Sequence, residues 1–193
     1  MIFSRYDSVE DPDCYPGSFV LKNRAGLQKQ EDLDAFETTM VSIRSAEAMP
    51  AGQCDAHHYR LIHHHLFQDI YDWSGNYRTV RTAKNGSMFC YPEHIADQME
   101  LLFASISQGV FLGGAATSEF VSASANFLSE LNAIHPFREG NGRTQLSFLF
   151  LLGERAGHSL DMTRVRAGPM LAAMIASFQG KLELLVEEIG WLL

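Results

Sequence analysis

The chain has 193 residues, of which 46% are hydrophobic and 20% are charged, and its formal net charge at pH 7 is −8. A chain of this length buries roughly 70% of its unfolded surface, so we expect residues 1–193 to form one domain with a sizeable core. The acidic balance argues against direct binding of nucleic acid, because proteins that bind it are normally basic. No segment approaches about 18 uninterrupted apolar residues, which argues against a membrane-spanning helix.

Cysteine usage and the amino terminus favour a reducing compartment. Cys14, Cys54 and Cys90 form no CxxC pair, and an odd number of cysteines does not suggest a disulfide framework. The first residues lack a basic region followed by an apolar one, so secretion by the general route is not expected. We therefore expect a cytoplasmic protein, and delivery by a specialised secretion system, which reads other signals, stays open.

Two helices are predicted in the first part of the chain. The first covers residues 26–47, and the second begins after a cap at Asp55 and stops near Gly75. The apolar side of the first helix is formed by Leu27, Phe36, Met40 and Ile43. The apolar positions of the second are Leu61, Ile62, Leu66, Phe67, Ile70 and Tyr71.

A β-hairpin is predicted over about residues 77–91. The pattern alternates over residues 77–81, Asn85 and Gly86 supply a turn, and the chain can return over residues 88–91. This hairpin is either an ordinary surface ribbon or an exposed edge that binds another chain.

Positive charge gathers at two places in this acidic sequence. Arg78, Arg81 and Lys84 lie in the predicted hairpin, and Arg138 and Arg143 lie further along the chain. Guanidinium and ammonium groups bind phosphate, so we expect phosphate groups near these residues. The alternative is a solvated edge with scattered positive charges.

Helices dominate the rest of the chain. Pro92 suits the first turn of a helix that runs through Ile106, and residues 109–114 form a small-residue loop. Thr117 or Ser118 caps a helix through Leu131. A last helical region opens at Asp161, is broken at Gly168–Pro169, and is bent at Gly180. The fold class that follows is all-α with one β-hairpin.

Five histidines crowd one short segment: His57, His58, His63, His64 and His65. Histidines on one helix face can bind a metal ion, but no HExxH motif and no cysteine pair accompany them. We therefore favour a structural or solvated cluster over a metal site. The chain also has no GxxxxGK[S/T] motif and no complete GxGxxG fingerprint, so the common nucleotide-binding loops are absent.

The chemistry is concentrated in residues 135–146, HPFREGNGRTQL. His135 can accept a proton near neutral pH, and Glu139 can bind a divalent cation through oxygen. The backbone of residues 140–142 can approach an anion closely, and Arg143 offers a planar set of donors for phosphate. The apolar run that follows predicts a buried helix to about residue 156, whose amino terminus would point at the phosphate.

This segment resembles the signature of the Fic (Fido) family, H-x-F-x-[D/E]-G-N-G-R-x-x-R. It matches every defined position except the last, where Leu146 replaces arginine. Residues 11–23 resemble the family's amino-terminal entry segment, residues 66–80 its passage from helix to flap, and residues 84–95 the flap and the following helix. The resemblance implies an all-α Fic-type fold with a β-hairpin flap.

The resemblance also implies an activity, protein adenylyl transfer from ATP, and a role for each motif residue. His135 would be the catalytic base that deprotonates a Tyr, Ser or Thr hydroxyl of a target protein, and Glu139 would bind Mg²⁺. The nucleotide would be bound by Glu139 and by Asn85, Gly86, Gly140, Asn141, Gly142 and Arg143. The flap would hold a segment of the target protein by strand addition.

Partners follow from the same resemblance. Similar family members are bacterial toxins that pair with a small separate antitoxin, and some modify topoisomerase subunits such as gyrase, which is an analogy for the target here. Self-inhibiting members carry an [S/T]-x-x-x-E helix, but no glutamate of this chain has Ser or Thr four positions before it. We therefore expect any inhibitory glutamate to come from an antitoxin.

Two alternative functions remain open from the sequence. Relatives with a lysine in place of the second motif glycine act as kinases that transfer the γ-phosphate, and Gly142 favours adenylyl transfer over that reaction. The other alternative is a catalytically weakened interaction module, because Leu146 replaces the final arginine of the motif.

Overall fold

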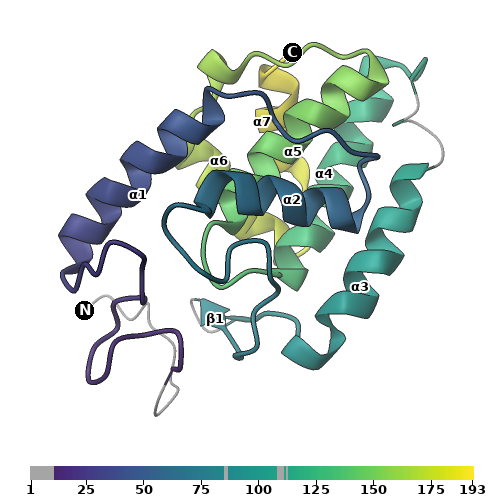
Figure 1. The fold of residues 1–193 in the computed structure, drawn as a ribbon. Helices are drawn as coiled ribbons and strands as arrows, with labels where there is room; N and C mark the ends of the chain where they lie inside the picture. The colour runs from purple at the N-terminus through teal and green to yellow at the C-terminus, as the bar shows by residue number, and fades with distance from the viewer. Residues whose placement is uncertain (1–10, 85–86, 108–110, 112) are drawn as a thin grey trace.

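The computed structural model describes residues 11–84, 87–107, 111 and 113–193. Within these ranges the chain is helical with one small β-hairpin, as predicted (Figure 1). The α-helices are α1 (Gln30–Ser45), α2 (Ala56–Phe67), α3 (Pro92–Ala104), α4 (Thr117–Ile134), α5 (Asn141–Ala156), α6 (Ala167–Ser177) and α7 (Glu183–Trp191). Short 3-10 turns follow at Ser105–Ser107 and Met162–Arg164.

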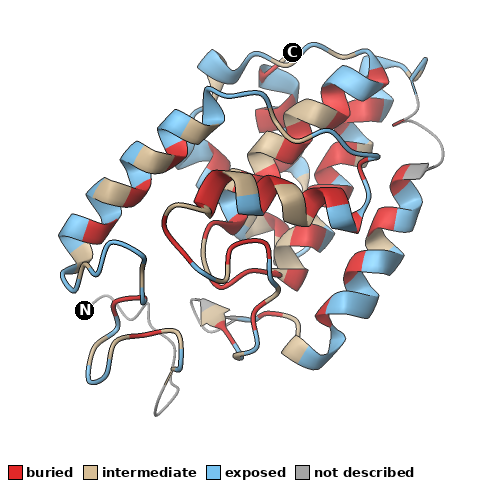
Figure 2. Ribbon diagram, viewed as in Figure 1, coloured by how far each residue is buried: buried red, intermediate tan, exposed pale blue. Residues whose placement is uncertain are grey.

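Helices α2, α4 and α5 form the centre of the fold, with α1 at one side and α3 at the other (Figure 1). α5 packs on α2 and α4, and α4 also contacts α3 and α7. Buried residues follow the inner faces of the helices, while the outer faces of α1 and α3 are exposed (Figure 2). The largest fully buried side chains are aromatic: Tyr59, Phe67, Tyr71, Phe120, Phe137 and Phe148. None of the helices described is long and apolar enough to span a bilayer.

The first helix begins four residues later than predicted. The Asn23 side chain donates to the Leu27 carbonyl (2.7 Å) and accepts from its N–H (2.9 Å), which holds a turn in which Gly26 has φ +69°. The buried positions of α1 are Leu33, Glu37 and Val41. The predicted apolar side was therefore partly wrong.

Ile43 is 50% exposed, whereas Phe36 and Met40 are half-buried. The buried stripe thus lies beside the predicted one and includes a glutamate. Helix α2 has the predicted cap, because the Asp55 carboxylate accepts from the His58 N–H at 2.7 Å. It ends at Phe67, before the predicted stop.

The predicted hairpin is present but short. β1 (Ala83–Lys84) pairs antiparallel with β2 (Ser87–Met88), and Ala83 lies opposite Met88. Residues 77–81 are not a strand, because the Arg78 N–H donates to the Pro136 carbonyl of the motif loop at 2.9 Å. The predicted turn residues, Asn85 and Gly86, lie outside the described residues.

The predicted ends of the next helices need corrections. Pro92 begins α3 as predicted, but α3 ends at Ala104 and passes into the 3-10 turn that contains Ile106. The N-cap of α4 is Ala116 rather than Thr117 or Ser118, and the Glu119 carboxylate accepts from the Ala116 N–H at 3.0 Å. Half of the predicted loop 109–114, residues 109, 110 and 112, lies outside the described residues.

The carboxyl-terminal helices break at a different glycine from the one predicted. Gly168 and Pro169 lie in the first turn of α6, where proline is tolerated because its missing N–H has no intrahelical acceptor. The chain bends instead between α6 and α7, where Gly180 has φ +79°. The predicted bend at Gly180 was right, and the predicted break at Gly168–Pro169 was wrong.

Candidate active site

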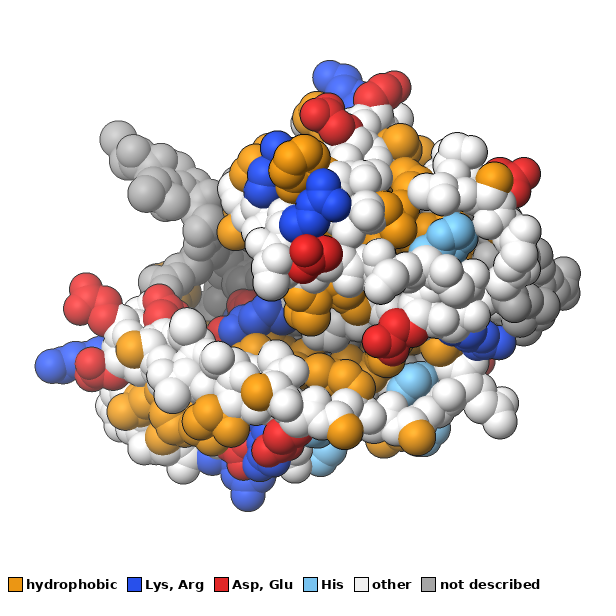
Figure 3. Space-filling view, turned by 90° about the horizontal axis from the view of Figure 1, so that it is seen from above, with side chains coloured by type: hydrophobic (Ala, Val, Ile, Leu, Met, Phe, Trp, Pro, Cys, Tyr) orange, Lys and Arg blue, Asp and Glu red, His pale blue; other side chains and the backbone are white. Residues whose placement is uncertain are grey.

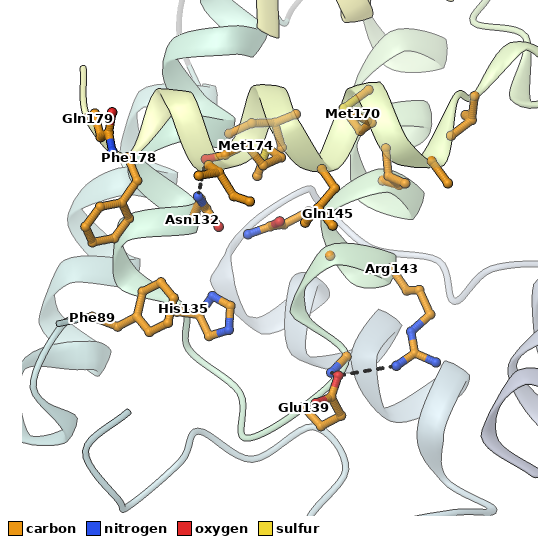
Figure 4. Close-up of a pocket in the computed structure, with 18 residues that line it drawn as sticks. Phe89, Asn132, His135, Glu139, Arg143, Gln145, Met170, Met174, Phe178 and Gln179 are labelled. Atoms are coloured by element: carbon orange, nitrogen blue, oxygen red, sulfur yellow. Dashed lines mark hydrogen bonds and ion pairs between the residues drawn. The ribbon is translucent and has the colours of Figure 1, made fainter. Parts of the chain in front are cut away.

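His135 lies where α4 ends and the motif loop begins. Its backbone is left-handed, with φ +49°, and its N–H donates to the Leu131 carbonyl at 3.0 Å. The imidazole stacks on the Phe89 ring with 3.9 Å between centroids and 10° between planes (Figure 4). Phe89 directly follows β2, so the chain at the end of the hairpin contacts His135, the predicted proton acceptor.

The motif loop is closed by two of its own residues. Phe137 is fully buried and stacks on His63 at 3.7 Å. The Asn141 side chain accepts from the Phe137 N–H (3.0 Å) and donates to its carbonyl (2.8 Å). The amide of Asn141 is therefore used inside the loop, and its backbone N–H, in the first turn of α5, is the group that can face an anion.

The two motif glycines meet different surroundings. Gly140 has φ +81°, and a Cβ there would lie 2.3 Å from Cζ of Phe67, so the fold requires glycine. A Cβ on Gly142 would meet nothing within 4 Å. Since Gly142 lies in the first turn of α5, the space beside it is open at a helix amino terminus, which is a favourable place for phosphate.

Arg143 lies between two carboxylates. Its Nη2 donates to Glu37 of α1 and to Glu139 Oε1 (3.4 Å), and its guanidinium lies 4.8 Å from the centroid of the Phe67 ring. Tyr71 donates to the other Glu37 oxygen at 2.5 Å. Burial raises the pKa of Glu37 and also that of Tyr71. Neither Glu37 nor Tyr71 is among the site residues predicted from the sequence.

Glu139 suits a divalent cation. Its side chain is 44% exposed, and Oε1 accepts from the Gly140 N–H at 2.8 Å as well as from Arg143. Because both contacts use Oε1, the second carboxylate oxygen is the one that can bind a cation. The residues described form no group of three or more histidine, cysteine or acidic ligands. A cation here would therefore take its remaining ligands from phosphate and water, as Mg²⁺ commonly does.

One cavity collects these groups. It has a volume of about 400 Å³, which is in the range of small-molecule sites. The motif side is lined by His135, Glu139, Gly140, Gly142, Arg143 and Leu146 (Figure 4). The opposite side is lined by the apolar residues Met170, Leu171, Met174, Ile175 and Phe178, most of them in α6. Leu146 is half-buried and also packs against the core.

Three of the predicted phosphate-binding arginines lie away from the cavity. Arg78 is 4% exposed and donates to backbone carbonyls, and Arg138 is 5% exposed and donates to Asp11 at 2.5 Å. Arg81 is exposed and lies over the Tyr91 ring. Among the four arginines predicted to bind phosphate, Arg143 is the one that lines the cavity. The face in Figure 3 shows acidic and basic side chains interspersed, without a broad basic patch.

The histidine cluster has structural contacts. His63 is fully buried, its Nδ1 accepts from the Gly75 N–H (2.8 Å), and its Nε2 therefore carries the proton donated to the Glu139 carbonyl (3.0 Å). Burial lowers the pKa of His63 to about 3, so the ring stays neutral. His58 likewise accepts from the Cys54 N–H and contacts the Pro50 carbonyl. His63 thus joins α2 to the motif loop.

Known proteins resemble this chain in sequence over most of its length. The sequence profile described as the Fic/DOC family matches residues 53–152, which include the motif. The chain is 48% identical over 186 residues to a Sinorhizobium fredii protein named probable protein adenylyltransferase y4lH, covering 96% of this chain and 97% of that one. It is 34% identical to protein adenylyltransferase VbhT of Bartonella schoenbuchensis, covering 94% of this chain but 38% of VbhT.

Two solved structures have the same fold as this chain. The BepC effector of Bartonella tribocorum, crystallised with AMPPNP, superposes with a TM-score of 0.83 at 25% identity, covering 93% of this chain and 95% of that one. A Fic domain from Bartonella quintana with bound ADP has a TM-score of 0.80 at 26% identity, with 93% of each chain covered. The chain belongs to the Fic/DOC family.

Proposed function

We propose that this chain is a protein adenylyltransferase that transfers AMP from ATP to a Tyr, Ser or Thr hydroxyl of a target protein. The observation that carries the proposal is the cavity that brings a base, a carboxylate and an arginine to the amino terminus of α5. The 48% identity to a relative named probable protein adenylyltransferase supports it.

His135 is the base in this mechanism. Its imidazole accepts the proton of the target hydroxyl, whose oxygen then attacks the α-phosphorus of ATP. A new oxygen–phosphorus bond forms, the bond from the α-phosphorus to the bridging oxygen breaks, and pyrophosphate leaves. General base catalysis of this kind typically contributes about 10² to 10⁴ in rate.

The nucleotide is bound by the start of α5 and the residues around it. The N–H groups of Asn141 and Gly142 face the phosphates, next to Gly140, whose own N–H donates to Glu139. The open space beside Gly142 accommodates the phosphates. Arg143 neutralises phosphate charge by exchanging part of its contact with Glu37 and Glu139 for phosphate oxygens. Glu139 holds Mg²⁺, which supplies charge neutralisation on the phosphates when bound. Asn85 and Gly86 complete the nucleotide site in this proposal.

The target protein binds along the flap. β1 and β2 are two residues each and form a two-stranded sheet, so their outer edges can accept a further strand. Because Phe89 follows the flap and stacks on His135, a strand held there lies near the base. A topoisomerase subunit is the target by analogy.

Restraint by a small antitoxin is part of the same proposal. The sequence offers no [S/T]-x-x-x-E segment of its own, so the inhibitory glutamate would be supplied in trans. Co-purification of a small protein that lowers the transfer rate, and an increase in that rate on its removal, would support this arrangement. An isolated chain that becomes active only when one of its own helices is deleted would contradict it.

The test is label transfer from ATP carrying the label at either the α- or the γ-phosphate, in a bacterial lysate containing the purified chain. We expect protein-bound label from the α-phosphate alone. Label from the γ-phosphate would indicate a kinase, and label from neither would indicate an interaction module.

A further inference from the structure

We propose that Arg78 is a positioning residue for His135, which fixes the backbone of the base and joins it to the flap. Its guanidinium is buried and donates to the carbonyls of His135 (Nε, 2.8 Å) and Ile134 (Nη2, 3.2 Å). It also donates to Val80 (Nη1, 2.8 Å) and Cys90 (Nη2, 2.5 Å), on the two sides of the hairpin base. One side chain therefore bonds both the end of α4 and the flap.

The chemistry of this contact requires arginine. The carbonyls of Ile134 and His135 lie at the carboxyl end of α4, where the helix dipole favours a positive charge. A guanidinium spreads its donors over a rigid plane and can reach carbonyls on several sides, whereas an ammonium is a compact point charge. Lysine at this position could keep the charge but not the four-way geometry.

The backbone of His135 shows why it needs support. A φ of +49° is unfavourable for a residue with a Cβ, and such conformations persist where the surroundings impose them. The Arg78 N–H also donates to the Pro136 carbonyl at 2.9 Å. Three consecutive carbonyls, those of residues 134–136, are thus bonded by the backbone and side chain of Arg78.

The flap contributes to the same unit. The Cys90 N–H donates to the Ala133 carbonyl (3.1 Å), and the Phe89 N–H donates to Thr82 (3.1 Å) across the hairpin base. Phe89 then stacks on the imidazole of His135. The backbone and the ring of His135 are therefore held by Arg78, Phe89 and Cys90, which we call the flap base. A target strand bound to the flap then meets an imidazole of fixed orientation.

The experiment compares Arg78→Gln and Arg78→Lys with Arg60→Gln. Arg60 is a matched control because its Nε donates to the Gly75 carbonyl (2.8 Å) and its Nη2 to Asn76 (3.3 Å), in the same passage of chain. Three quantities are measured for each folded variant: label transfer from α-labelled ATP, calorimetric affinity for Mg·AMPPNP, and amide exchange in peptides covering residues 80–90 and 133–137.

We expect Arg78→Gln to lower the transfer rate about 10- to 100-fold, because small displacements of a reacting group have effects of this size. Its affinity for Mg·AMPPNP should change less than about twofold, since His135 is not a nucleotide ligand in the proposed function. Amide exchange should accelerate in both peptides. Arg78→Lys should lie between Arg78→Gln and the parent, and Arg60→Gln should match the parent in transfer rate and affinity.

The assignment is overturned if Arg78→Gln keeps the parental rate and exchange. It is also overturned if rate, affinity and global stability fall together, because Arg78 would then be a general structural residue. If Arg78→Gln does not fold, Arg78→Lys carries the same comparison. The expected change in transfer rate rests on the proposed function. A parent chain that transfers no label contradicts that function. Amide exchange in the two peptides still decides whether Arg78 couples the flap to His135.

Discussion

The cavity and the flap base use arginine in opposite ways. Arg143 has a side chain 35% exposed, lies between two carboxylates and faces the cavity. Arg78 is 4% exposed and is surrounded by backbone carbonyls. A partly exposed guanidinium can exchange a carboxylate for a phosphate, whereas a buried one bonded to carbonyls holds its neighbours in place.

The same contrast runs through the whole motif. Phe137, the side chain of Asn141 and the Cβ direction of Gly140 face inward, although the backbone of Gly140 also borders the cavity. The side chains of His135, Glu139 and Arg143, and Gly142, line the cavity. Inward-facing residues should therefore control stability, and cavity-facing residues should control binding and rate.

The largest effect is expected for the cavity-facing base. His135→Ala should lower adenylyl transfer about 10² to 10⁴-fold, because His135 is the proposed base. Thermal stability and calorimetric affinity for Mg·AMPPNP should remain close to the parental values. A variant that still labels its target at the parental rate would remove His135 from the mechanism.

The two motif glycines give a matched pair. Gly140→Ala should lower the free energy of unfolding by about 2 to 4 kcal/mol, because its backbone is left-handed and a Cβ would overlap the Phe67 ring. Gly142→Ala should keep or raise stability by up to about 1 kcal/mol, since alanine favours a helix, and should weaken Mg·AMPPNP binding. Denaturant unfolding and calorimetry measure both. Equal losses of stability in the two variants would contradict the contrast.

The pH dependence of stability tests the role of His63, a buried residue that contacts the motif loop. The pKa of about 3 for His63 in the folded chain lies below the ordinary histidine pKa of 6.5, so between these pH values the unfolded chain binds a proton that the folded chain does not. Stability from this residue is therefore present above pH 6.5 and is lost as pH falls towards 3. Between pH 6.5 and 4.5 the loss should be about 2 to 3 kcal/mol.

This part of the pH dependence should disappear in His63→Gln. His57→Gln is the control, because His57 lies on the same helix but is exposed. Denaturant unfolding at the two pH values, compared with the parent, gives the part of the change in unfolding free energy that His63 causes. If His63→Gln keeps the parental slope, the buried neutral imidazole is not its source.

The smallest effect is expected at the position where the motif departs from the family. Leu146 lines the cavity three residues after Arg143, so an arginine there could reach the phosphates. Leu146→Arg should raise adenylyl transfer about tenfold, the value of a charge-assisted hydrogen bond, and should tighten inhibition by an antitoxin glutamate. Leu146→Met controls for packing. An unchanged transfer rate in a folded Leu146→Arg variant would mean that position 146 contributes to core packing and not to phosphate binding.

The sequence could predict that the motif residues share one cavity, because they are close together in the chain. One loop and one helix start determine where His135, Glu139, Gly142 and Arg143 lie, and their spacing is visible directly. The helical class, the cap at Asp55 and the proline in the first turn of α3 were also predictable, since the start of a helix depends on local residues.

The missed features depend on contacts between distant segments. Glu37 is 106 residues from Arg143, and Arg78 is 57 residues from His135. Arg78 could not be told from a phosphate ligand by its charge alone. One signal for Glu37 was present: Leu33 and Val41 lie four positions before and after it, which puts a glutamate on a helix face that is otherwise buried.

The most direct test of the central claim is peptide mass spectrometry of proteins modified by the purified chain and ATP, with His135→Ala as the parallel sample. The proposal predicts a Tyr, Ser or Thr of a target peptide that carries one AMP group in the parental sample and none in the variant. A peptide that carries a phosphate alone, or an AMP group that forms equally with His135→Ala, would contradict it.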